Sequence, residues 1–64
     1  MTETEFFKLS FPQQVEIVEE YTTEVNHFTL ADNYENYIYS FDTLFLSVIV
    51  NPHLEIERIE RFAG

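Results

Sequence analysis

The chain has no cysteine, a single glycine and only two prolines among its 64 residues. Without cysteine, disulfides and thiolate metal sites are excluded. The one glycine is Gly64, so the glycine-rich loops that cradle phosphates in nucleotide-binding proteins are excluded too. A chain this short buries only about 60% of the surface that its unfolded form exposes. Self-association is then the remaining common source of extra stability.

Basic residues are also scarce, because three Lys and Arg face twelve Asp and Glu, for a net charge of −9. Such a surface repels nucleic acids and anionic lipids, so we expect no binding to DNA, RNA or a membrane. The charge mainly indicates solubility. An alternative is an acidic inhibitor that imitates a nucleic acid and occupies a basic groove of a partner protein. Its acidic surface would be formed by Glu16, Glu19, Glu20 and Glu24.

Long apolar runs are missing. The longest, Leu44–Leu46 and Val48–Val50, fall far short of the ~20 residues that span a bilayer. No basic segment precedes an apolar stretch near the N-terminus, so we expect no secretory signal and a cytoplasmic location. The hydrophobic fraction of 45%, with seven Phe and four Tyr, predicts a chain that folds. We therefore expect residues 1–64 to form one small domain.

Two capping boxes open the chain. Thr2 with Glu5, and Ser10 with Gln13, each pair a hydroxyl with a carboxylate or amide three residues later. They predict a short helical turn and then a helix from about Ser10 to Thr22. Helical spacing predicts that the helix buries one face, formed by Phe11, Val15, Val18 and Tyr21/Thr22.

The pattern after Thr23 changes to that of strands, predicted at Val25–Leu30, Tyr34–Phe41 and Leu44–Val50. The only connector between the last two is Asp42-Thr43, and a two-residue hairpin loop fixes the register. That register places Phe41, Tyr39, Tyr37 and Glu35 opposite Leu44, Leu46, Val48 and Val50. Seven of these eight residues are apolar or aromatic, so we expect the helix to pack on this face.

The other face of the predicted sheet is half apolar, whereas a face left to water normally carries polar side chains. Ser and Asn border its apolar stripe, which consists of Tyr34, Ile38, Phe45 and Ile49. We expect this stripe to be the interface of a homodimer or of another protein–protein contact. The 2–9 segment, with Phe6, Phe7 and Leu9, is the only other part of the chain able to cover it.

The tail from 53 to 62 fits two structures. Leu54 and Ile56 alternate as in a strand, whereas Ile56, Ile59 and Phe62 recur every three residues as in a helix. A fourth strand is favoured. The predicted class is α+β, with the N-terminal helix packed on a three- to four-stranded antiparallel meander.

Three motifs resemble those of small bacterial proteins of unassigned function. They are Phe7-x-x-Ser10-Phe11-x-x-Gln14-Val15-x-x-Val18, then Ile38-Tyr39-Ser40-Phe41-Asp42 with Phe45-Leu46-x-Val48-x-Val50-Asn51-Pro52, and Glu55-Ile56-x-Arg58-Ile59-x-x-Phe62. The resemblance implies an N-terminal helix followed by an antiparallel β-meander. It implies no activity, cofactor or catalytic residue.

Residues able to carry chemistry are few. Ser40, His27 and Asp42 are the one set with triad chemistry, but no glycine stands beside any serine to form a nucleophile elbow, so we do not expect an enzyme. On a regular strand His53, Glu55 and Glu57 would project from one face, which suits a divalent ion. A charged edge strand explains the same residues without a metal. No cofactor is expected.

Overall fold

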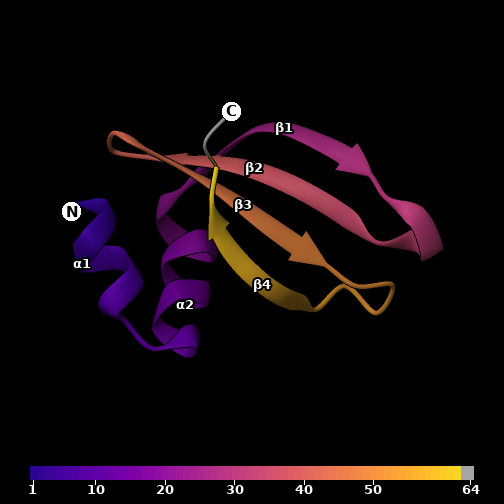
Figure 1. Ribbon diagram of the computed structural model, residues 1–64, viewed down its shortest axis with the longest axis horizontal. Helices are drawn as coiled ribbons and strands as arrows, with labels where there is room; N and C mark the ends of the chain where they lie inside the picture. Colours follow the sequence, from indigo (N-terminus) through magenta and orange to yellow (C-terminus); the bar gives the residue numbers. More distant parts are fainter. Residues whose placement is uncertain (63–64) are drawn as a thin grey trace.

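The computed structural model describes residues 1–62. Two helices precede a four-stranded antiparallel sheet of order β1-β2-β3-β4 (Figure 1). The elements are α1 (Glu3–Lys8), α2 (Phe11–Tyr21), β1 (Thr23–Thr29), η1 (Ala31–Asn33), β2 (Glu35–Phe41), β3 (Leu44–Val50) and β4 (Ile56–Arg61). The predicted α+β class is confirmed, and the tail forms the fourth strand. Neither helix among these residues has the length and apolar character needed to cross a membrane.

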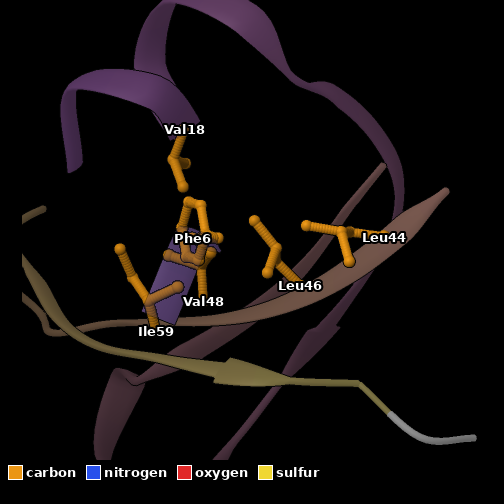
Figure 2. Packing of buried hydrophobic residues seen from close by; sticks show 6 residues of the cluster. All are labelled: Phe6, Val18, Leu44, Leu46, Val48 and Ile59. Atoms are coloured by element: carbon orange, nitrogen blue, oxygen red, sulfur yellow. The ribbon is translucent and has the colours of Figure 1, made fainter. Parts of the chain in front are cut away.

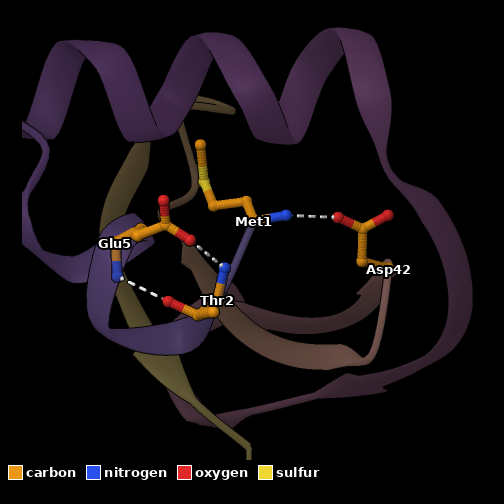
Figure 3. Close-up of polar contacts among 4 residues, drawn as sticks. All are labelled: Met1, Thr2, Glu5 and Asp42. Atoms are coloured by element: carbon orange, nitrogen blue, oxygen red, sulfur yellow. Dashed lines mark hydrogen bonds and ion pairs between the residues drawn. The ribbon is translucent and has the colours of Figure 1, made fainter.

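Both helices begin at the predicted capping boxes. The Thr2 hydroxyl accepts from the Glu5 amide at 3.2 Å, and the Glu5 carboxylate accepts from the Thr2 amide at 2.7 Å (Figure 3). Ser10 and Gln13 repeat the exchange at 3.3 and 3.0 Å. Each exchange satisfies amides that have no partner within the helix. The start of each helix is therefore specified by residues within the first thirteen positions of the chain.

Two ion pairs hold α1 near the sheet. The Met1 ammonium lies 2.8 Å from a carboxylate oxygen of Asp42, in the β2–β3 turn (Figure 3). The hydrogen bond to Asp42 raises the pKa of this amine. Arg61 of β4 lies 3.1 Å from Glu3 of α1. All four groups are exposed in part, so each pair contributes little stability. They link α1 to the sheet without adding much to its stability.

The predicted hairpin register is confirmed in full: Phe41 pairs with Leu44 and Glu35 with Val50, with every intervening pair in register. The turn requires a positive φ, which Asp42 adopts at 54°. Asp tolerates this conformation because its short polar side chain bonds locally. Alternation on both strands and the turn therefore specify the same pairing.

The core lies between the helices and one face of the sheet. Its buried side chains come from both helices and two strands, and they are Phe6, Val18, Leu44, Leu46, Val48 and Ile59. Figure 2 shows Phe6 of α1 and Val18 of α2 directed toward the side chains of the strands. The N-terminal segment therefore packs on the same face as α2. It does not cover the opposite face.

The buried side of α2 differs in part from the prediction. Val18 is buried and Val15 packs against the core as predicted, but Phe11 and Tyr21 are exposed and the polar Gln14 is buried. The Gln14 amide donates to the backbone carbonyls of Phe6 and Leu9, each at 3.3 Å. α2 is therefore turned so that a polar side chain faces α1, where it donates to the Leu9 carbonyl and adds a second donor to the Phe6 carbonyl, which also accepts from the Leu9 amide.

The two edge strands are irregular. β1 carries a bulge between Glu24 and Asn26, and the β3–β4 ladder shifts between Ile49 and Val50. β4 begins only at Ile56, so Leu54 lies in the preceding turn instead of on the strand. Bulges bend and twist a strand, which makes an edge a poorer template for another strand.

Candidate functional site

The face of the sheet opposite the helices is called the open face. No helix within residues 1–62 packs against it, because α1 and α2 both join the core on the other side. The register places eleven side chains on it: Thr23, Asn26, Phe28, Asn36, Ile38, Ser40, Phe45, Ser47, Ile49, Arg58 and Glu60. Phe62 extends it, since its amide donates to the Phe45 carbonyl at 2.9 Å and continues the β3–β4 ladder.

Three phenylalanines remain accessible on the open face. Phe45 is 50% exposed, Phe28 is 46% exposed and Phe62 is 38% exposed. They come from β3, from β1 and from the residue after β4, so the apolar area spreads across the sheet. Exposed apolar side chains gathered on one face of a small protein commonly mark a contact surface.

The sequence-predicted interface residues are placed differently from one another. Phe45 is exposed, while Ile49 and Tyr34 are half-buried. Ile38 lies on the open face but is only 2% exposed, so it offers almost no area to a partner. It stands on an inner strand, where side chains on both neighbouring strands flank it. Ile38 therefore packs between the side chains of the open face and does not form part of its accessible surface.

Phe28 and Phe62 were missed by sequence reasoning. The side of the sheet on which Phe28 lies depends on the β1 bulge, and the side on which Phe62 lies depends on the tail being a strand. The available signal was a phenylalanine next to a polar residue near each end of the predicted sheet, since Phe28 lies between His27 and Thr29 and Phe62 follows Arg61.

The polar part of the open face is almost neutral. Asn36 donates to the Ser47 hydroxyl at 2.7 Å and to the Val48 carbonyl at 3.3 Å. Among the open-face positions that the register pairs in the described strands, only Arg58 and Glu60 are charged, and they lie 3.3 Å apart. This face therefore carries no net formal charge on a chain of −9.

A second uncovered surface lies on the helix side of β1 and β2. The rings of His27 and Tyr37 stack with centroids 4.8 Å apart, and Tyr39 follows Tyr37 at 6.1 Å. The Tyr37 hydroxyl donates to Glu35 at 2.6 Å, and His27 Nε2 lies 3.4 Å from the other Glu35 oxygen. These four residues are called the aromatic ledge.

Hydrogen bonding and charge shift the ledge's titrations. Donation to Glu35 raises the pKa of Tyr37 to about 12. The same bond, with a smaller contribution from His27, lowers the pKa of Glu35. Burial, followed by the charges of Glu24 and Glu19, raises the pKa of Tyr39. Both hydrogen bonds to Glu35 therefore favour its ionised form, which is the negative group of the ledge.

A hollow of about 380 Å³ adjoins the ledge. The turns that supply its lining lie at the end of the sheet away from the helices (Figure 1). Thr29, Asn33, Glu35, Asn51, Pro52 and Leu54 line the hollow. The η1 turn and the β3–β4 connection form its walls, and both turns contain residues with positive φ. Glu35 belongs to the hollow and to the ledge.

The predicted metal set is not brought together. Within residues 1–62, no three His, Cys, Asp or Glu side chains are grouped closely enough to hold an ion. His53 and Glu55 precede β4 and Glu57 lies at its bulge, so they do not share a regular strand. The Asn51 amide instead donates to Glu55 at 3.2 Å and to Glu57 at 3.1 Å.

The triad set is likewise separated. The register places Ser40 on the open face and His27 on the opposite one, while Asp42 lies in the β2–β3 turn with the Met1 ammonium. A nucleophile needs its base within hydrogen-bond reach, so these three residues have no catalytic geometry.

The predicted acidic surface is accessible. Glu16, Glu19 and Glu20 are exposed on α2 and Glu24 is exposed on β1. Within residues 1–62, none of these four forms an ion pair. Their charge is available to a partner or to water.

Comparison with protein-family models, with curated proteins and with solved structures found no match for this chain. The resemblance to small bacterial proteins therefore stays a prediction, and what the chain does is inferred from its own residues.

Proposed function

We propose that this protein is a small non-catalytic interaction module that self-associates through its open face. The observation that carries the proposal is the group of three exposed phenylalanines on a face without net charge. A two-fold dimer lays the same patch on itself, so each phenylalanine contacts apolar surface of the second copy.

Charge favours this face over the others. Two copies of a −9 chain repel each other, and at physiological salt the repulsion reaches about 8 Å. The open face brings only Arg58 and Glu60 into contact, and a two-fold axis lets Arg58 of each copy approach Glu60 of the other. An interface on the outer side of α2 would bring Glu16, Glu19 and Glu20 of one copy against the same residues of the other, and these like charges repel.

The size of the face sets the strength of the dimer. Four strands at about 4.8 Å spacing and about 3.3 Å per residue give a footprint of roughly 400 Å². Standard interfaces bury about 800 Å² of accessible surface per partner. Side chains that project from the sheet make its accessible surface larger than this flat footprint, but not large enough to reach that value. We expect a weak dimer with a dissociation constant in the micromolar range.

Sedimentation tests the proposal. The wild type should pass from monomer to dimer between about 10 µM and about 500 µM. Phe45→Lys should stay monomeric, because it places two ammonium groups against apolar surface. Phe11→Lys is the matched control, since Phe11 is 44% exposed but lies on α2. A monomeric wild type, or equal effects of the two variants, contradicts the proposal.

A second candidate is the acidic inhibitor of a basic partner, which the four unpaired glutamates of α2 and β1 favour. Binding of that kind weakens steeply with salt, because screening acts on exposed charges. Changing Glu16, Glu19, Glu20 and Glu24 to Gln should abolish such a complex and leave the dimer intact or tighter. The same variant therefore separates the two functions.

A further inference from the structure

The hollow at the end of the sheet has a mixed lining that suits one kind of ligand. Its only charged residue is Glu35, its neutral polar residues are Thr29, Asn33 and Asn51, and its apolar residues are Pro52 and Leu54. A ligand with a cationic head and an aliphatic stem matches this combination.

Glu35 is oriented before any ligand arrives. Tyr37 bonds one carboxylate oxygen at 2.6 Å and His27 lies 3.4 Å from the other. A carboxylate has about four acceptor positions, so roughly two remain for donors from outside. A group that presents two parallel N–H donors uses both at once, and guanidinium is the side chain with that geometry.

The rings next to Glu35 hold its carboxylate in place and do not themselves line the hollow. His27 and Tyr37 stack on each other nearly parallel, with 12° between their planes, and Tyr39 follows Tyr37. The preference for arginine over lysine therefore comes from the two open acceptor positions of Glu35, which match the guanidinium fork better than the point charge of an ammonium.

The rim of the hollow has an unusual residue. Leu54 is 82% exposed and adopts a φ of 66°, a conformation that bulky side chains rarely take. Exposure of a large apolar side chain on a strained backbone is a signal of function more than of stability. Beside Pro52, Leu54 provides an apolar wall along which an aliphatic stem can lie.

We propose that the hollow binds the side chain of an arginine from a partner protein, with the guanidinium on Glu35 and the stem along Leu54. The −9 charge draws basic partners toward the molecule, and the hollow then selects arginine among their cations. The site lies on the helix side of the sheet, so it is separate from the open face.

An NMR titration of the full chain tests this site. The probes are N-acetyl-arginine amide, N-acetyl-lysine amide and a short peptide containing one arginine. We expect amide shifts at Thr29, Glu35 and Leu54, with lysine at least several-fold weaker than arginine and the peptide tighter than the amide. Equal affinities for arginine and lysine, or shifts confined to α2, would overturn the proposal. A peptide no tighter than the amide would overturn the assignment to a protein partner.

Two charge-matched variants separate the site from general attraction. Glu35→Gln and Glu16→Gln each remove one negative charge, but Glu16 is exposed on α2 and does not line the hollow. We expect Glu35→Gln to weaken arginine binding about tenfold and Glu16→Gln to change it less than about twofold. Equal losses would show that net charge alone attracts the probe.

Leu54→Asn separates binding from folding. Asn adopts positive φ readily, so the melting temperature should stay level or rise while arginine binds several-fold more weakly. Unchanged affinity would contradict the placement of the stem. Phe45→Lys should bind arginine as the wild type does, so failure of the dimer and failure of this site are distinguishable.

Discussion

Phe6→Ala is the most demanding test of the fold. Phe6 is completely buried although α1 has only six residues, and it meets Val18, Leu46, Val48 and Ile59 in one cluster (Figure 2). Removing its ring leaves a cavity that helices and sheet together line. A helix this short has little stability of its own, so it depends on docking, and Phe6 is its one fully buried side chain.

The expected loss is large for a domain of this size. Phe→Ala in a core costs about 3–5 kcal/mol, from lost burial and from the cavity. At about 0.05–0.15 kcal/mol per residue, a chain of 64 residues has a total stability of roughly 3–10 kcal/mol. The variant should therefore lose about 30% or more of its stability and melt about 15 °C or more below wild type.

Thermal melting followed by circular dichroism measures this, with Phe7→Ala as the control. Phe7 is the next residue and touches the Phe6 ring edge-on at 5.0 Å, yet it is partly exposed. We expect Phe7→Ala to cost less than about 1.5 kcal/mol. A Phe6→Ala protein that melts within a few degrees of Phe7→Ala would refute the assignment of α1 to the core.

Two further changes test individual polar contacts. Gln14→Leu removes the side-chain donor of the Leu9 carbonyl and leaves the Phe6 carbonyl with the Leu9 amide alone. It should cost about 1–3 kcal/mol and lower the urea midpoint at an unchanged slope; an unchanged midpoint would remove this link. For Tyr37, the pKa of about 12 lies above the unfolded value near 10, so its stabilisation holds below pH 10 and is lost as pH rises toward 12. Tyrosinate absorbance should show this late component, and Glu35→Gln should move it to lower pH; a titration unaffected by Glu35→Gln would contradict the bond.

The sheet could be predicted from the sequence because several local signals agreed. Alternation along Glu35–Phe41 and Leu44–Val50 separates two faces, and Asp42-Thr43 leaves one way to connect them. A slip by one residue would turn Leu46 and Val48 to the other face, which makes the register costly to change. The capping boxes likewise act within four residues and depend on no distant contact.

The packing of the helices could not be predicted because it depends on contacts between distant segments. Phe6 and Phe7 are equivalent in a short helical turn, and only docking decides which one is buried. The apolar spacing of α2 correctly gives Val15 and Val18 as core residues, but it contains no sign that Gln14 bonds to α1 while Phe11 stays exposed. Tertiary context overrides a pattern when the helix is this short.

The open face was predicted in its position and only partly in its members. The alternation of side chains along β2 and β3 places Ile38, Phe45 and Ile49 on one face. It does not show which of these three side chains is shielded from solvent by its neighbours. Phe28 depends on a bulge, which shifts the alternation by one residue and leaves no clear mark in the sequence.

The two proposed surfaces lie on opposite sides of one sheet, and this arrangement has a consequence for binding. A dimer formed through the open faces buries Phe45 and leaves both copies of Glu35 accessible on its outer surfaces. Two arginine sites would then point away from each other, so one partner chain reaches both only if it extends around the dimer. Avidity is lost when geometry forbids simultaneous engagement. A compact basic partner would therefore be held at one hollow at a time, and the dimer would join two such partners instead of gripping one more tightly.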